Sequence, residues 1–424
     1  MTEPQDRSPV VSRRKLLGAA GAGALIAGAA GAGAGYAAGD QPTAVRADPG
    51  ALPVTFEGKH QAGIVTPAQD RLYFSVLDVT TASRGDLILL MQDWTRAARQ
   101  MTAGNDVGEL GAVGGAPYAP PEDTGEALGL PPSNLTITVG FGPSLFDDRF
   151  GLADLRPERL GDLPTFAGDR LKPELTGGDL VIQACANDPQ VAVHAVRNLV
   201  RIAFGRASVR YSQMGFGRTS STSSGQVTPR NLFGFKDGTA NIKAEEAKTV
   251  DDFVWVQPGD GPDWLVGGSY LVARKIDMRI ETWDREALSG QEGIIGRAKG
   301  SGGPLSGGDE FDPIDFAVKG DDGEPAIPLK SHVRLAHPDF NDGVQILRRG
   351  YNFVDGSNGL GQLSAGLFFI SYQRDPEQFS TIQRSLAGSN NDLLNEYIVH
   401  VGSGLWACPP GVTADGFWGD TLLS

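Results

Sequence analysis

Cysteine is scarce in this sequence: the 424 residues include only Cys185 and Cys408. Two cysteines exclude a disulfide scaffold and a multi-cysteine zinc site. Because neither lies in a motif, we expect both to be small core residues with free thiols. Basic residues are also outnumbered, with 37 Lys and Arg against 51 Asp and Glu, which gives a formal net charge of −14. Since nucleic-acid binding requires a basic surface, we expect no nucleic-acid partner.

Several catalytic motifs are absent as well. The sequence has no Cys-x-x-Cys-His for covalent haem, no His-Glu-x-x-His, no Gly-x-Ser-x-Gly, no P-loop and no Gly-x-Gly-x-x-Gly that opens a helix after a strand. These absences exclude c-type haem proteins and remove most support for hydrolases and nucleotide-binding enzymes. Histidine is rare, so few residues are available for acid–base or metal chemistry: His60, His194, His332, His337 and His400.

The N-terminus has the pattern of an export signal. The pair Arg13-Arg14 precedes a stretch, residues 18–38, that is almost all Ala and Gly. We interpret residues 1–47 as a twin-arginine signal peptide and expect a periplasmic, cell-envelope or extracellular protein. A permanent membrane anchor is the alternative, but Ala and Gly are poorly hydrophobic. Cleavage fits after residue 47 or residue 37. Because this route exports folded proteins, often with a cofactor loaded, it favours a bound cofactor.

The rest of the chain shows two rounds of strands and helices in the same order, which indicates an α+β fold of two ferredoxin-like halves. We place these halves at residues 48–214 and 215–424, with a Ser-, Thr- and Gly-rich connecting loop at 215–224. Apolar periodicity in the first half predicts strands at 71–79, 135–139, 179–185 and 207–213 and helices at 86–95 and 189–204. In the second half it predicts strands at 268–279 and 366–373 and helices at 283–299 and 375–386.

Two segments of the second half carry the candidate chemistry. In residues 231–241 a carboxylate, Asp237, lies in an apolar loop whose flanking glycines allow the backbone to approach a flat ligand closely. The alternative is an ordinary turn with a capping aspartate. In the second segment His332 precedes the pair Arg348-Arg349 by sixteen residues. A lone histidine is often a structural residue, so by themselves these residues leave both interpretations open.

Together the two segments resemble the dye-decolorizing peroxidase family. Gly234-Phe235-Lys236-Asp237-Gly238 fits the family signature Gly-x-x-Asp-Gly, and His60 to Pro67 fits its first-strand motif. The resemblance covers about residues 55 to 420, and these segments match as well: 135–141, 281–284, 291–292, 296–299 and 347–353. With its twin-arginine signal, the chain is similar to the exported group that includes the deferrochelatase/peroxidase proteins.

The resemblance implies a non-covalent haem b bound between or within the two halves, in a dimeric α+β barrel-like superfamily. It implies His332 as the axial iron ligand, with His337 as the competing choice, Asp237 as the distal acid–base and Arg348 as the distal arginine. Arg349 is then a structural or surface residue. Asp392 matches the acidic partner of the axial histidine, and a helix N-terminal aspartate is the alternative. Further residues expected around haem are Gly238, Thr239, Ala240, Arg297, Pro338 and Asp339.

The expected activity is that of a haem peroxidase, which uses hydrogen peroxide to oxidise dyes, phenols or other reductants. A bulky dye must react at the surface, and Tyr351, Tyr372, Tyr397, Trp406 and Trp418 are the candidates for carrying its electron inward. One alternative is a deferrochelatase that takes free haem as substrate, releases its iron with the porphyrin intact and works with components of an iron-uptake system. Another is a non-catalytic haem carrier, but a carrier needs no distal Asp and Arg. A homodimer is expected from the family.

Overall fold

The computed structural model describes residues 52–387 and 391–424, so the predicted signal peptide, residues 1–47, lies outside the described residues. In the first half, β-branched and aromatic residues form strands, and polar caps begin the helices. The side chain of Ser83 accepts a hydrogen bond from Asp86 N at 3.2 Å at the start of α2, and Asp188 accepts one from Gln190 N at 2.7 Å before α3. The elements are β1 (Arg71–Val79), α2 (Arg84–Thr102), β2 (Thr136–Phe141), β3 (Leu180–Ala186), α3 (Pro189–Ile202) and β4 (Ala207–Arg218).

The second half repeats this plan with additional short elements. Its strands are β5 (Ser269–Met278), β6 (Leu347–Arg348), β7 (Tyr351–Ser357), β8 (Leu363–Gln373) and β9 (Ile398–Cys408). Its helices are α4 (Ala247–Phe253), α5 (Ile280–Trp283), α6 (Leu288–Ile295), α7 (His332–Ala336), α8 (Pro376–Ala387) and α9 (Asp420–Leu423). The strand order is β2-β3-β1-β4 in the first half and β9-β5-β8-β7 in the second, with antiparallel neighbours. The predicted fold class, α+β with two ferredoxin-like halves, is confirmed.

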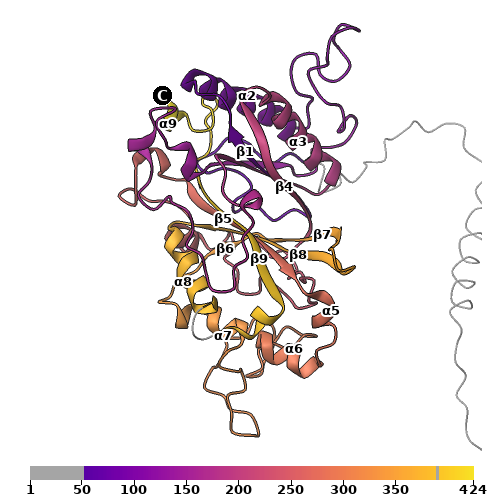
Figure 1. Cartoon of the computed structure of the whole chain (residues 1–424), viewed down its shortest axis with the longest axis vertical. Coiled ribbons are helices and arrows are strands. Elements are labelled where there is room, and N and C mark those ends of the chain that lie inside the picture. Colours follow the sequence, from indigo (N-terminus) through magenta and orange to yellow (C-terminus); the bar gives the residue numbers. More distant parts are fainter. Residues whose placement is uncertain (1–51, 388–390) are drawn as a thin grey trace, which may run out of the picture. The chain divides into compact units, whose positions relative to one another are not determined.

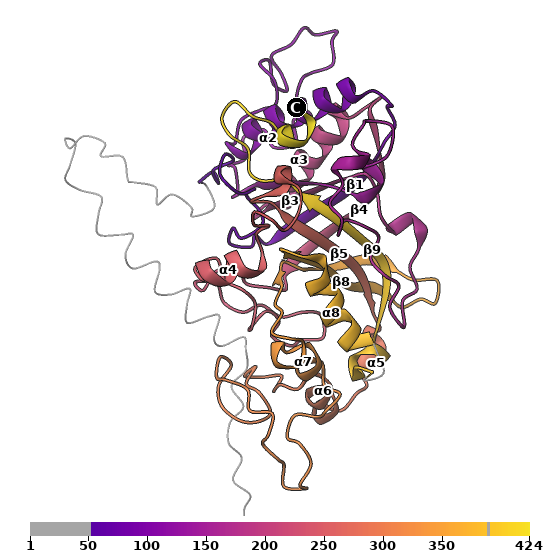
Figure 2. The ribbon, with the colours of Figure 1, turned by 90° about the vertical axis from the view of Figure 1, so that its left-hand side faces the viewer.

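The two half-sheets join at both edges and form one closed barrel. Strand β4 pairs with β7 at Phe216 and Asn352, and β2 pairs with β9 at Phe141 and Ala407. Large apolar side chains from both halves, including Phe74, fill a common core. Figures 1 and 2 show α2 and α3 at one end of the described chain and α6 and α7 at the other, with the strands between them. Closure leaves few unpaired strand edges.

Some element boundaries differ from the predicted ones. The helix expected at 283–299 is shorter: α5 ends at Trp283, and α6 begins at Leu288 and ends where Gly296 adopts a left-handed conformation with φ of +96°. Because Gly has no Cβ, it readily takes this conformation and ends a helix there. Strand β4 continues to Arg218, past residue 214, where we placed the end of the first half. Strands β7 and β9 were not among the predicted elements.

Other features of the described chain concern the cysteines and membrane spans. Cys185 and Cys408 are buried free thiols, as expected. None of the helices within residues 52–387 and 391–424 is both long enough and apolar enough to cross a membrane.

A buried ion pair links the halves. A loop of the first half runs along β9, where Arg170 N donates to His400 O at 2.9 Å and Lys172 N donates to Val401 O at 2.8 Å. This loop carries Asp169, which pairs with Arg274 of β5, and each side chain is only 1% exposed. Burial lowers the pKa of Arg274, and the Asp169 carboxylate counteracts that effect. A buried charge without its partner is strongly destabilising.

We predict that Asp169→Ala lowers the free energy of unfolding by about 3–5 kcal/mol, because it leaves the Arg274 guanidinium buried without a counter-charge. Guanidinium chloride unfolding followed by circular dichroism measures this. The matched control is Glu377→Ala, which removes the half-exposed pair with Arg384 on α8 and is expected to cost less than about 1 kcal/mol. Equal losses in the two variants would contradict the prediction.

Candidate active site

A cavity of about 490 Å³ opens within the second half, and its lining residues run from Asn231 to His400. It therefore lies within one half and not between the two. Its wall is largely apolar, because alternate residues of β5, β8 and β9 present their side chains to it, among them Ile276, Phe369 and Ile398. Polar groups also enter this space from several elements, among them His332 of α7, Asp237 of the loop after β4 and Arg348 of β6. An apolar cavity with a few convergent polar groups is typical of a cofactor site.

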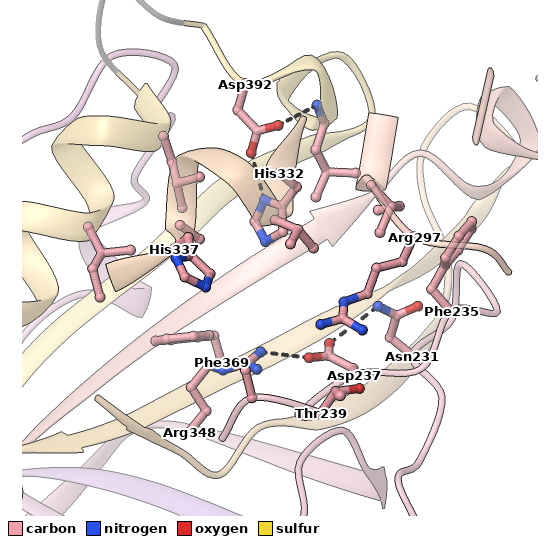
Figure 3. A pocket seen from close by; sticks show the side chains of 18 of the residues that line it. Asn231, Phe235, Asp237, Thr239, Arg297, His332, His337, Arg348, Phe369 and Asp392 are labelled. Atoms are coloured by element: carbon pink, nitrogen blue, oxygen red, sulfur yellow. Dashed lines mark hydrogen bonds and ion pairs between the residues drawn. The ribbon is translucent and has the colours of Figure 1, made fainter. Parts of the chain in front are cut away.

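His332 lies on one side of the cavity, at the first position of α7. Its Nδ1 donates to Oδ2 of Asp392 at 2.6 Å, and the Asp392 side chain is 1% exposed. Figure 3 shows the other ring nitrogen, Nε2, directed into the cavity. Burial lowers the pKa of His332, but the charge and hydrogen bond of Asp392 outweigh burial, and the net pKa is raised. The Asp392 carboxylate therefore fixes both the ring orientation and the nitrogen that faces the cavity.

Asp392 has both roles considered from the sequence: it is the acidic partner of His332 and it caps a helix. Its Oδ2 accepts from His332, while its Oδ1 accepts from Leu394 N at 2.9 Å and caps the short 3₁₀ helix Leu393–Glu396. The adjacent backbone is anchored as well, because Leu393 N donates to Lys330 O at 3.1 Å. The helix cap thus fixes the Asp392 carboxylate, and this carboxylate in turn orients the His332 imidazole.

Asp237 and Arg348 lie on the opposite side of the cavity (Figure 3). Arg348 Nη1 donates to Asp237 Oδ1 at 2.6 Å, and Asn231 Nδ2 donates to Asp237 Oδ2 at 3.2 Å. The neighbouring Gly238 has φ of +89°, and a Cβ there would lie 2.8 Å from Ser220 Cα. Only glycine fits this position without distortion. The loop conformation therefore depends on the glycine of the Asp-Gly pair.

Arg297 enters the cavity between these two sides (Figure 3). It is 8% exposed, and its Nη1 donates to two main-chain carbonyls, Gly302 O at 2.7 Å and Glu310 O at 2.9 Å. Burial lowers the pKa of Arg297, and the nearby Glu310 carboxylate opposes that shift. Thr239 and Ala240 line the same region, and Thr239 Oγ1 donates to Glu310 Oε1 at 3.1 Å.

His337 also lines the cavity, but its surroundings differ from those of His332. Its Nδ1 accepts from Asp339 N at 3.3 Å, and the Asp339 carboxylate lies 3.5 Å away with 69% of its side chain exposed. Burial lowers the pKa of His337. Pro338 lines the cavity, whereas Asp339 is not among its lining residues. Of the two histidines, His332 alone has a buried carboxylate on Nδ1.

Two segments that together cover most of the chain match a known protein family. The family description "Dyp-type peroxidase, N-terminal" matches residues 61–217, and "Dyp-type peroxidase, C-terminal" matches residues 228–413. The chain belongs to the Dyp-type peroxidase family. The peroxidase activity expected from the sequence is confirmed at the level of this family.

Individual proteins are also similar to this chain over most of its length. A deferrochelatase of Escherichia coli K12 is 38% identical over 419 residues, which cover 97% of each chain. Among solved structures, ferric DtpA from Streptomyces lividans has a TM-score of 0.80 at 37% identity and covers 88% of this chain and 98% of its own. A Dyp-type peroxidase from Cellulomonas bogoriensis has a TM-score of 0.79 at 38% identity, covering 89% of this chain and 100% of its own.

The cavity of this Dyp-type peroxidase fits haem b in three respects. Apolar side chains suit the faces and edges of a porphyrin ring, and the Nε2 of His332 faces inward as an axial ligand requires. The guanidinium of Arg297 is buried and bonded only to main-chain carbonyls in the contacts that the structure shows, so it suits a carboxylate such as a haem propionate.

Sequence reasoning missed several residues of the site. Asn231 donates a hydrogen bond to Asp237, and Glu310 accepts one from Thr239. Arg274 and His400 line the cavity wall. Burial lowers the pKa of His400 to about 3, with a further contribution from Arg274. Asn231 could have been predicted, because it lies three residues before the Gly-x-x-Asp-Gly signature. Arg274 carried no such signal, because it lies in a strand that looks purely structural. His400 was noted as one of the few histidines, but no motif around it indicated a place in the site.

Proposed function

We propose that this protein is an exported haem peroxidase in which His332 holds the iron on one side and Asp237 and Arg348 handle peroxide on the other. The observation that carries the proposal is the arrangement across one cavity: a carboxylate-bound imidazole faces a carboxylate–guanidinium pair. The cofactor is haem b, and the chain has no Cys-x-x-Cys-His motif for a covalent link. The substrates are hydrogen peroxide and a reducing molecule.

Several residues would hold the cofactor. His332 would bind iron through Nε2, since Nδ1 is engaged by Asp392, and this carboxylate would make the imidazole a stronger donor. Arg297 pairs with a propionate. Gly238, Thr239, Ala240, His337 and Pro338 line the cavity and would contact the bound cofactor.

The distal pair supplies proton transfer and charge stabilisation. When bound, haem would supply the redox chemistry that reduces peroxide. Cleavage of the O–O bond requires a proton to leave one oxygen and reach the other. The Asp237 carboxylate accepts and returns this proton, directly or through a water. The Arg348 guanidinium, 2.6 Å from Asp237, stabilises negative charge on the departing oxygen.

The first test is cofactor retention. We predict that His332→Ala loses most of its haem or changes the Soret spectrum, whereas His337→Ala keeps both, because of these two histidines only His332 has Nδ1 hydrogen-bonded to a buried carboxylate. The measurement is the haem-to-protein ratio and the absorption spectrum of each purified variant. If His332→Ala retained the normal spectrum, the axial assignment would be wrong.

The second test concerns the proton carrier. Asp237→Asn keeps the shape of the side chain but cannot take a proton from peroxide, so we predict a second-order rate constant with peroxide that is lower by about 10²–10⁴-fold. Stopped-flow absorption of the haem-loaded protein measures it. Asp339→Asn, at an exposed carboxylate, is the control and is expected to react normally. A normal rate for Asp237→Asn would rule out the proposed role.

Bulky reductants require a path from the surface, and the structure separates the five aromatic candidates. Tyr351, Tyr372, Trp406 and Trp418 are at most 1% exposed. Tyr397 is half-buried and lies edge-on to Trp283 at 5.0 Å, and Trp283 stacks at 4.4 Å on the cavity residue Phe233. The Tyr397 hydroxyl donates to Glu286 at 2.9 Å, so Glu286 can take its proton on oxidation. We propose Tyr397 and Trp283 as the relay.

The corresponding prediction compares the oxidation of a bulky dye with that of a small phenol. Tyr397→Phe is expected to lower the turnover of a bulky dye severalfold while leaving the peroxide rate and the oxidation of a small phenol unchanged. The matched control is Tyr372→Phe, because this buried hydroxyl has no hydrogen-bond partner in the described chain. If Tyr397→Phe affected dye and phenol equally, substrates would be reaching the haem edge directly.

Deferrochelatase activity is the second candidate, favoured by the name of the relatives that match 97% of this chain. In that case free haem is a substrate, and components of an iron-uptake system are partners. Incubation of haem with the reduced protein, followed by protoporphyrin fluorescence, distinguishes the two activities. The haem-carrier alternative loses support, because a carrier needs no Asp237–Arg348 pair.

Export and assembly complete the proposal. The Arg13-Arg14 motif supports twin-arginine export to the periplasm, cell envelope or exterior. Fractionation of cells that produce a double Arg→Lys variant at these positions tests this. We also propose a homodimer, which the sedimentation velocity of the purified protein tests.

A further inference from the structure

Asp237 and Arg348 are 111 residues apart in sequence, so their contact requires the two backbones to be held together. Arg348 is the last residue of β6, a strand of only two residues. One edge of β6 pairs with β8, through Leu347 with Tyr372 and Arg348 with Ser371. A strand this short does not by itself fix the direction of a long, half-exposed side chain.

On the other edge of β6, the side chain of Asn241 binds the main chain of Arg348. Arg348 N donates to Asn241 Oδ1 at 2.7 Å, and Asn241 Nδ2 donates to Arg348 O at 2.9 Å. Asn241 Nδ2 also donates to Ser221 O at 3.0 Å, and the residue is 4% exposed. The amide thus pairs with both main-chain groups of Arg348 in the way a neighbouring strand would.

Asn241 also belongs to the loop that carries Asp237. Its own N–H donates to Gly238 O at 3.1 Å and closes a turn directly after the Asp-Gly pair. Lys243 reinforces the same region, since its Nζ donates to Ser221 O at 2.8 Å and to Gly238 O at 3.3 Å. One residue therefore connects the backbone of the carboxylate loop to the backbone of the arginine.

We infer that Asn241 is a positioning residue that sets the geometry of the Asp237–Arg348 pair. The inference rests on the proposed function, since it concerns the same distal site. It requires an amide: an aspartate at this position accepts from Arg348 N but donates to neither Arg348 O nor Ser221 O, and it brings carboxylate charge against two carbonyl oxygens. A misplacement of about 1 Å in a reacting group can cost about 10²-fold in rate.

The experiment compares Asn241→Asp and Asn241→Ala with matched variants at Asn198, all as haem-loaded protein. Asn198 is equally buried and makes three bonds, to Thr124 N, Thr124 Oγ1 and His194 O, in the half of the chain that does not line the cavity. We expect the Asn241 variants to react with peroxide about 10- to 100-fold more slowly. We also expect weaker cyanide binding, at normal haem content. The Asn198 variants should keep normal rates and cyanide affinity.

A double substitution separates positioning from general damage. In an Arg348→Leu background, Asn241→Ala is expected to add less than about a twofold further loss, because coupled residues give non-additive effects. If Asn241→Ala lowered the rate by the same factor with Arg348 present and with Arg348→Leu, the inference would be overturned. It would also be overturned if the Asn241 variants reacted as fast as the Asn198 variants while Arg348→Leu reacted slowly. If Arg348→Leu itself reacted at the normal rate, the proposed role of Arg348 would fail, and the inference with it.

Discussion

The structure depends on pairing the edges of two half-sheets. Each ferredoxin-like half has two open edges, at β2 and β4 in the first and at β7 and β9 in the second, and an isolated half would expose them. Short β4–β7 and β2–β9 pairings join these edges and close the barrel. Closure also fixes one face of β5, β8 and β9 as a rigid wall. That wall is the surface against which the cofactor cavity is built.

The charged groups of the cavity are held in place by contacts with the protein itself. Asp392 orients His332, Arg348 and Asn231 hold Asp237, and main-chain carbonyls hold Arg297. His332, Asp237 and Arg297 therefore each have a hydrogen-bond partner, as the low dielectric of an interior requires. A site organised in this way loses little free energy to rearrangement when charge develops on the reactants, which is the basis of electrostatic catalysis. The two faces are also chemically distinct, with a donor imidazole on one and an acid–base pair on the other.

The glycines show how packing overrides local preference. Gly402 and Gly404 weaken the strand pattern of β9, which is why that strand escaped prediction. In the barrel, a Cβ at Gly404 would lie 2.0 Å from the Trp406 ring and one at Gly402 would lie 2.8 Å from Leu175 O. These positions require glycine because neighbouring atoms fill the space, and sequence periodicity carries no information about those atoms. The short helix α7 escaped for another reason, since five residues are too few to show a helical period.

The sequence by itself determined the fold class, the family resemblance and the residues with unusual chemistry: the Gly-x-x-Asp-Gly loop with Asp237, the segment with His332, and Arg348. These follow from local patterns, which any reader of the chain can see. Only the tertiary structure decided that Asp392 binds His332 rather than capping a helix alone, that His337 lacks an equivalent buried partner, and that Asn241 joins the two distal segments. The reason is physical. The His332–Asp392 and Asn241–Arg348 contacts join residues that are distant in sequence, and a hydrogen bond of under 3 Å depends on how the folded chain places them.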